Sequence, residues 1–211
     1  MPAPQTETEN CVAHNGGIIP VPGRDIMAQA WYQGGISVFD FTDSAHPVEI
    51  AFFDRGPIDA KNLITGGYWS AYWYNGNLYA SEIARGVDVF KLMPSEFLSQ
   101  NEIAVATLMR SNEYNPQDQT RITYPDSSLV ARAYLDQLTR SKTIQPERSK
   151  TVSDALERVD KIGSRNASAV IERLDALAAE FERDANTASG IDATRMKALA
   201  ATLRNRATTG K

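Results

Sequence analysis

Gly35-Ile-Ser-Val-Phe-Asp-Phe41 recurs 51 residues later (86 − 35) as Gly86-Val-Asp-Val-Phe-Lys-Leu92. Repeats of roughly 20–50 residues built from short strands are typical of β-propeller blades and similar arrays. One such unit cannot bury both faces of its own sheet, so it needs stacked neighbours. The chain holds barely two units, whereas propellers have about four to eight blades. We therefore expect part of a propeller, with further blades upstream of Met1.

The first copy of the repeat lies within a complete set of four predicted strands. We expect these strands at residues 16–21, 26–32, 36–41 and 48–53. Turn-forming residues separate them, including Pro22-Gly23 and the loop that ends at Pro47. Four antiparallel strands joined by short turns make one propeller blade.

The second copy lies within a unit that has three predicted strands of the four in a blade. Strands are expected at residues 69–74, 77–83 and 87–92, and Asn75-Gly76 is a strong signal for a tight hairpin between the first two. Where a fourth strand should follow, Pro94-Ser-Glu-Phe97 has the pattern of a helix start. The fold class we predict is a β-propeller fragment of about two blades, followed by an α-helical bundle.

The chain changes its period after the second unit. Three or four amphipathic helices are expected from about residue 125 onward, and Thr151-Val-Ser-Asp154 has the pattern of a capping box at the start of one of them. The predicted domains are 1–93 for the incomplete propeller, 94–124 for a short helix and linker, and 125–211 for the helical domain.

Charge and composition argue against several classes of partner. The formal net charge is −4 and the pI is about 5.3, so no basic field attracts nucleic acid. No segment reaches the roughly 20 apolar residues that span a bilayer. The first ten residues lack the basic and apolar regions of a signal peptide.

The first repeat resembles a known family. Residues 34–51, Gly-Gly-Ile-Ser-Val-Phe-Asp-Phe-Thr-Asp-Ser-Ala-His-Pro-Val-Glu-Ile-Ala, are similar to the LVIVD repeat of bacterial and archaeal β-propellers, with Asp40 and Pro47 at its Asp and Pro positions. The second copy is weaker, because Lys91 replaces the Asp. The segment from about Thr8 to Leu92 looks like the end of such a propeller with a helical C-terminal extension.

The resemblance implies a fold and a location, but no reaction. Such propellers are secreted or associated with the cell envelope, so we expect an extracellular or envelope protein. The leading hypothesis is a non-enzymatic binding or scaffold module for a protein or small-molecule ligand. The alternative is a fragment of a propeller-channel enzyme, with or without a metal ion, in which His14 and Glu82 belong to a site completed by other blades.

His14 is the first candidate for a ligand-binding or metal-binding residue. It precedes the strand that lines the channel of a propeller, near one mouth. Histidines at this position in several blades would bind a divalent metal, whereas a single one is usually a hydrogen-bonded structural residue. The second unit has Gly66-Gly67 near the matching position, and His46 lies in an outer loop. We therefore expect no complete metal site, and no other cofactor, within this sequence.

Glu82 and Arg85 are the other candidates for the channel mouth. They stand one repeat after Trp31 and Gly34. A carboxylate and a guanidinium there could bind a ligand or act as an acid–base pair, although a structural ion pair across the turn is the favoured interpretation. No residue is assigned a catalytic role.

Two further features have structural interpretations. Aromatic residues are dense in both units, and packing between blades is favoured over stacking on a flat ligand such as a sugar. They are Trp31, Tyr32, Trp69, Tyr72, Trp73 and Tyr74. Cys11 is the single cysteine, so it is either a small buried residue or half of a disulfide with a partner outside this sequence.

Overall fold

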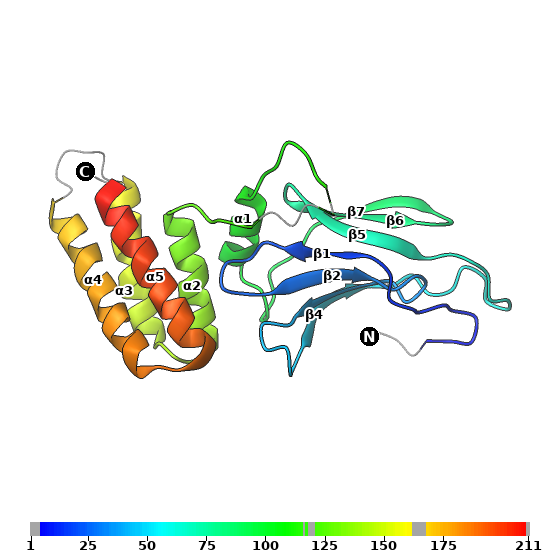
Figure 1. Cartoon of the computed structure of the whole chain (residues 1–211), viewed down its shortest axis with the longest axis horizontal. Coiled ribbons are helices and arrows are strands. Elements are labelled where there is room, and N and C mark those ends of the chain that lie inside the picture. Colours follow the sequence, from blue (N-terminus) through cyan, green and yellow to red (C-terminus); the bar gives the residue numbers. More distant parts are fainter. Residues whose placement is uncertain (1–4, 116, 118–120, 162–167, 210–211) are drawn as a thin grey trace. The chain divides into compact units, whose positions relative to one another are not determined.

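The computed structural model describes residues 5–115, 117, 121–161 and 168–209. The chain divides into two units, Met1–Ile122 and Thr123–Lys211, which are described separately. Within the described residues, the first unit contains two antiparallel sheets and one helix, and the second contains four helices (Figure 1).

The first sheet has four strands in the order of the sequence. They are β1 (Gly16–Ile19), β2 (Ile26–Ala30), β3 (Ile36–Asp40) and β4 (Val48–Phe53). The prediction of a four-stranded antiparallel sheet is confirmed, and β4 has the predicted bounds. The predicted first and second strands each extended two residues too far.

The second sheet has three strands, as predicted. They are β5 (Tyr68–Tyr74), β6 (Asn77–Glu82) and β7 (Gly86–Phe90). Asn75 and Gly76 have φ of 48° and 96°, which are the values of a type I′ hairpin turn. The two sheets do not close into a ring. The described residues therefore form two antiparallel sheets but no closed propeller.

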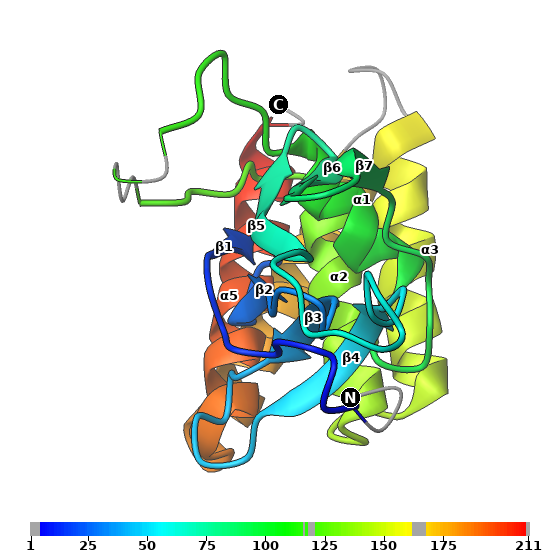
Figure 2. The ribbon, with the colours of Figure 1, turned by 90° about the vertical axis from the view of Figure 1, so that its right-hand side faces the viewer.

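The two sheets pack face to face around an apolar core. Residues of alternate positions on β2 and β3, such as Ala28 and Val38, are buried against Trp73 and Ala80 of the second sheet. The first strands of the sheets, β1 and β5, lie side by side (Figure 2). This stacking buries one face of each sheet and leaves the other face uncovered by the partner sheet.

Helix α1 (Gln100–Leu108) belongs to the core of the sheet unit. Ile103 and Ala106 are buried in that core, and Trp73 Nε1 donates a hydrogen bond to the Ala106 carbonyl at 3.3 Å. The predicted helix start at Pro94-Ser-Glu-Phe97 is wrong. The helix begins after Ser99, whose side chain forms a capping box with Glu102.

A buried ion cluster fastens α1 to the first sheet. The Arg24 guanidinium donates to Asp40 Oδ2 at 2.6 Å and to Glu102 Oε1 at 2.9 Å. It also donates to the Phe97 carbonyl at 2.7 Å. The side chains of Arg24 and Glu102 are 5% and 0% exposed. Because each charge faces an opposite one inside the fold, removing one would leave the others unpaired in a poorly solvated place.

The described residues of the second unit form a bundle of four helices. They are α2 (Ser128–Arg140), α3 (Pro146–Lys161), α4 (Ser168–Thr187) and α5 (Gly190–Thr209). Its core is mainly aliphatic, with Tyr134 and Phe181 as buried aromatic residues, and the Arg148 guanidinium lies over Phe181 at 4.3 Å from the ring centroid. The predicted capping box at Thr151 is wrong, because α3 already begins at Pro146, the proline that is favoured at a first helical position.

Candidate functional site

His14 lies beside the end of β2, where hydrogen bonds of the His14 backbone hold it. Its N–H donates to the Ala30 carbonyl at 2.9 Å, and its own carbonyl accepts from Gln29 Nε2 at the same distance. The segment before β1 is thereby fixed against the sheet.

The imidazole of His14 forms an aromatic cluster with Tyr32 and Trp69. Its ring centroid lies 4.3 Å from that of Trp69 and 5.1 Å from that of Tyr32. Tyr32 follows β2 with φ 50°, and its backbone forms a bridge with Tyr68, the neighbour of Trp69. Trp69 is exposed, so this aromatic cluster presents a surface on which a flat or apolar group can stack. It joins residues from both sheets.

A hydrogen bond fixes which nitrogen of His14 carries the proton. His14 Nδ1 lies 2.6 Å from the Trp69 carbonyl oxygen. A carbonyl oxygen only accepts, so Nδ1 must be the donor, and the neutral imidazole then has an unprotonated Nε2. Within the described residues, no hydrogen bond reaches Nε2. This nitrogen can accept a hydrogen bond from a ligand or coordinate a metal ion.

We predict that neutral His14 is the Nδ1–H tautomer in solution. Long-range ¹⁵N–¹H correlation spectra distinguish the two tautomers through the ¹⁵N shifts of the ring. His46→Gln leaves His14 as the sole histidine and so assigns the signals. A neutral ring with its proton on Nε2 would contradict the hydrogen bond to Trp69.

Glu82 is buried and holds the connection between the two sheets. The residue is 4% exposed, and its Oε1 accepts the Gly67 N–H at 2.5 Å. Its Oε2 is buried with no hydrogen-bond partner among the described residues. Gly67 has φ +90° and passes close to the backbone of Tyr32. Glu82 therefore positions the strand start that carries Trp69.

Arg85 is exposed and supports the same connection from another point. Its Nη2 donates to the Pro57 carbonyl at 3.3 Å. Among the described residues Glu82 and Arg85 form no ion pair with each other, so the favoured interpretation of a pair across the turn is wrong. The structure also does not bring either side chain into a hydrogen bond with His14. Each of the two contacts a different backbone group of the segment between the sheets.

Gln33 is a buried residue of this region that the sequence did not single out. Its Nε2 donates to the Ile64 carbonyl and its Oε1 accepts from the Ile58 N–H, both at 2.8 Å. One amide thus holds two points of the segment that connects the sheets. A glutamine in a Gly-rich turn carries no sequence signal for this role, because its two partners lie 25 and 31 residues away.

A second group of side chains links β4 to the second sheet. The Tyr68 hydroxyl donates to Asp88 Oδ2 at 2.6 Å, and Arg55 pairs with Asp88 Oδ1 at 2.7 Å. Burial and the hydrogen bond to Asp88 raise the pKa of Tyr68 well above its ordinary value. Tyr68 therefore stays protonated and acts as a donor that aligns β5 and β7.

The described residues contain no group of three His, Cys, Asp or Glu side chains that could hold a metal ion. His46 is exposed and pairs with Asp43. Cys11 has no disulfide partner in the part of the chain that the structure covers, and its thiol donates to Gln5 Oε1 at 2.5 Å. Burial, followed by the charges of Glu9 and Asp54, raises the pKa of the Cys11 thiol.

Comparisons with known proteins do not identify a family for this chain. None of the described helices is long and apolar enough to cross a membrane. No protein-family model, no curated protein and no solved structure matches the chain.

Proposed function

We propose that this protein is a non-enzymatic binding or scaffold module of an LVIVD-type β-propeller that works outside the cell or in its envelope. The two sheets would be consecutive blades, and further blades would cover the faces that the two sheets leave exposed. The sequence repeat supports this proposal, because its two copies occupy the third strand of each sheet, β3 and β7.

The observation that carries the proposal is the apolar surface on the outward faces of the two sheets. On the second sheet, Tyr79 pairs with Val89 and Ser81 pairs with Val87, so these side chains share the face turned away from the core. Val87 is 68% exposed and Val89 57%. Solitary exposed apolar side chains are ordinary, but neighbouring ones on one sheet face mark a surface for burial.

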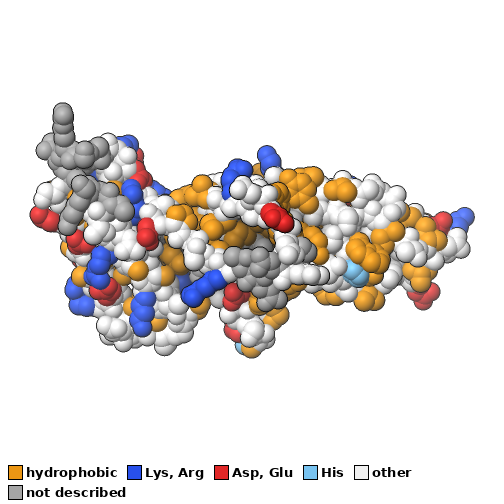
Figure 3. Space-filling model, turned by 45° about the horizontal axis from the view of Figure 1, so that its top comes forward, with side chains coloured by type: hydrophobic (Ala, Val, Ile, Leu, Met, Phe, Trp, Pro, Cys, Tyr) orange, Lys and Arg blue, Asp and Glu red, His pale blue; other side chains and the backbone are white. Residues whose placement is uncertain are grey.

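The first sheet exposes apolar side chains on the outward face of its outer strands, β1 and β4, while Gln29 and Ser37 between them are buried. Phe52 pairs with Ser37, which pairs with Gln29, and Ile18 lies on the same side of β1. Phe52 is 57% exposed and Ile18 is also exposed. Figure 3 shows hydrophobic side chains over one face of the sheet unit. A stack that continued on both sides of this pair of sheets would bury both faces, as in a propeller.

The edge of β7 supports the same proposal. Its repeat counterpart β3 lies between β2 and β4, whereas the structure describes no strand on the far side of β7. The strand β7, Gly86–Phe90, contains neither proline nor lysine, residues that commonly prevent a free edge from pairing, and its single charged residue is the inward-facing Asp88. A fourth strand placed as β4 is in the first sheet would complete this unit.

The aromatic cluster of His14, Tyr32 and Trp69 is the binding site that we assign to this module. It offers an exposed indole face and an imidazole nitrogen that accepts hydrogen bonds. A propeller-channel enzyme would need a second functional group beside His14. Glu82, the residue proposed for that role, contacts Gly67 instead.

Self-association of the chain tests the proposal about the sheet faces. The double variant Val87→Lys/Val89→Lys should raise the dissociation constant of self-association about tenfold or more. A loss of about 1.4 kcal/mol in the free energy of association corresponds to a factor of ten in this constant. Sedimentation equilibrium of the full chain over a range of concentrations measures this. The matched control is Leu63→Lys/Leu108→Lys, which adds the same charge at exposed apolar positions outside the sheet faces.

A wild-type chain that stays monomeric at every concentration would contradict the proposal. An equal loss of association in the control variant would contradict it as well. That result would mean that net charge, and not the outward face of the second sheet, controls association.

A further inference from the structure

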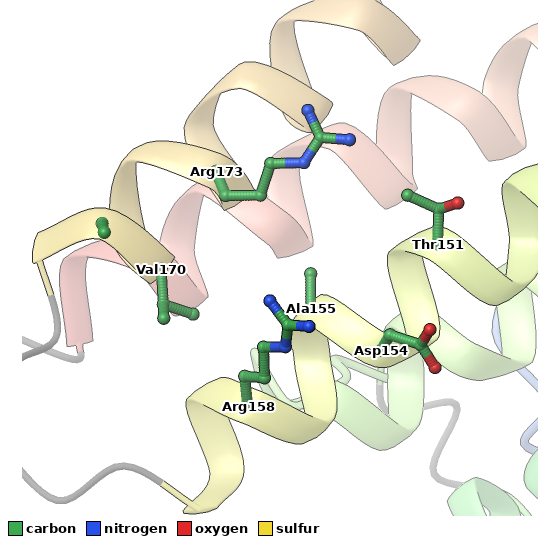
Figure 4. A pocket seen from close by; sticks show the side chains of 7 residues that line it. Thr151, Asp154, Ala155, Arg158, Val170 and Arg173 are labelled. Carbon is green, nitrogen blue, oxygen red and sulfur yellow. The ribbon is translucent and has the colours of Figure 1, made fainter.

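Helices α3 and α4 enclose a groove of about 260 Å³ within the helical unit (Figure 4). Its lining consists of Thr151, Asp154, Ala155 and Arg158 from α3 and Ala169, Val170 and Arg173 from α4. Pockets for drug-sized ligands usually measure about 300–1,000 Å³, so this groove suits a small ligand.

Small side chains create the hollow. Ala155 and Ala169 stand where larger residues would fill the space between the two helices, and Ala155 is itself buried. Val170 adds a second apolar surface. The floor of the groove is therefore apolar, and its polar groups lie on the walls.

Two arginines that line this groove have no partner among the residues that the structure describes. Arg158 on α3 and Arg173 on α4 form no ion pair or hydrogen bond with any other described residue. Most other arginines of the described helices are paired with carboxylates: Arg132, Arg148, Arg195, Arg204 and Arg206. Figure 4 shows Arg158 rising from α3 toward α4, while Arg173 extends from α4 along the groove.

Asp154, the one carboxylate among the described residues of the lining, does not neutralise these arginines. Asp154 pairs with Lys150, whose Nζ lies 2.7 Å from its Oδ2. The Thr151 hydroxyl donates to the Glu147 carbonyl within α3, so it forms a wall and does not donate into the groove. The described lining therefore carries two guanidinium groups and one carboxylate, and that carboxylate is paired with Lys150, which does not line the groove.

We propose that this groove binds a phosphomonoester dianion that carries a small apolar substituent. A guanidinium presents two N–H donors in a fork that matches the oxygens of a phosphate group. Two such groups on facing helices balance a dianion, and the substituent lies on Ala155 and Val170. The proposal concerns the helical unit and does not depend on the function proposed for the sheets.

Phenyl phosphate is the probe that tests this site. We expect saturable binding by the full chain with a dissociation constant of roughly millimolar or below. Calorimetry measures this binding, and the Nε–Hε signals of the arginines in ¹⁵N-resolved spectra show which arginines contact the ligand. Arg158→Gln and Arg173→Gln should each weaken binding about tenfold. Arg183→Gln, an exposed arginine of α4 outside the groove, removes the same charge and should leave binding unchanged.

Two vesicle preparations distinguish the sources of the phosphate group. Binding to vesicles of phosphatidic acid that is lost in Arg158→Gln and Arg173→Gln would identify a lipid headgroup. Binding of phenyl phosphate without binding to these vesicles would identify a soluble phosphomonoester. Either outcome supports the site, with phosphatidylcholine vesicles as the control.

Other results would overturn the proposal. They are the absence of saturable binding of phenyl phosphate, equal binding of uncharged phenol, and an equal loss of affinity in Arg183→Gln. All three variants change exposed side chains, so unchanged helix content by circular dichroism shows that the bundle is folded in each.

Discussion

Gly67→Ala should destabilise the sheet unit by about 2–5 kcal/mol, the sum of about 1–2 kcal/mol for a left-handed backbone and about 1–3 kcal/mol for the forced displacement of packed neighbours. Gly67 has φ +90°, and a Cβ there would lie 2.0 Å from the Tyr32 carbonyl carbon and 2.1 Å from the Gln33 nitrogen. Both obstacles are backbone atoms at the aromatic cluster, so no side-chain rotation relieves the clash. The same substitution also moves the N–H that Glu82 accepts.

Gly86→Ala is the matched control. Gly86 has φ +96°, but a Cβ there meets no atom within 4 Å. It should therefore cost only the strain of the backbone, about 1–2 kcal/mol. Urea unfolding followed by tryptophan fluorescence measures both, because Trp31, Trp69 and Trp73 all lie in the sheet unit. Equal losses in the two variants would contradict the close approach of Gly67 to Tyr32.

Arg24→Met should destabilise the sheet unit by about 3–5 kcal/mol, because it leaves the fully buried Glu102 without its guanidinium. Arg85→Met changes an exposed arginine with a single carbonyl contact and should cost less than about 1 kcal/mol. The same fluorescence measurement applies. A loss in Arg24→Met as small as that in Arg85→Met would show that Arg24 does not compensate the buried charge.

Asp40 makes the same cluster dependent on pH. Burial would raise the pKa of Asp40, but hydrogen bonds from Thr42 and the Arg24 guanidinium outweigh it, so the pKa lies below its ordinary value of 3.8. The stability that Asp40 contributes is therefore complete above that value and is lost as the pH falls below it. The difference in unfolding free energy between wild type and Asp40→Asn should shrink over that acidic range. A difference independent of pH would contradict the lowered pKa.

Local patterns predicted the strands because strand and turn signals lie close together in the sequence. Asn75-Gly76 determines a hairpin by backbone geometry alone, because both residues adopt the positive φ that a type I′ turn requires. The helix starts were less predictable. Pro94-Ser-Glu-Phe97 has the composition of a helix start, yet the helix begins after Ser99. The Glu102 carboxylate accepts the Ser99 N–H and is itself bound by Arg24, 78 residues away.

The candidate site was predictable only in part. His14 was selected from its place before a strand, and the structure places its ring against Trp69 from the other sheet, 55 residues away. Such a contact depends on how the sheets stack, which no local pattern encodes. Gln33 and Glu82 hold the connecting segment through buried hydrogen bonds, and their partners likewise lie far along the chain.

Hydrogen exchange in β7 tests most directly whether the second sheet is an unfinished blade. Its repeat counterpart β3 is paired on both sides and serves as the internal control. In dilute solution we predict that all amides of β3 are protected, whereas those of β7 that point away from β6 exchange rapidly. At concentrations where the chain associates, these β7 amides should become protected. Full protection of β7 in a monomer would contradict the account, because it would mean that the edge is already paired.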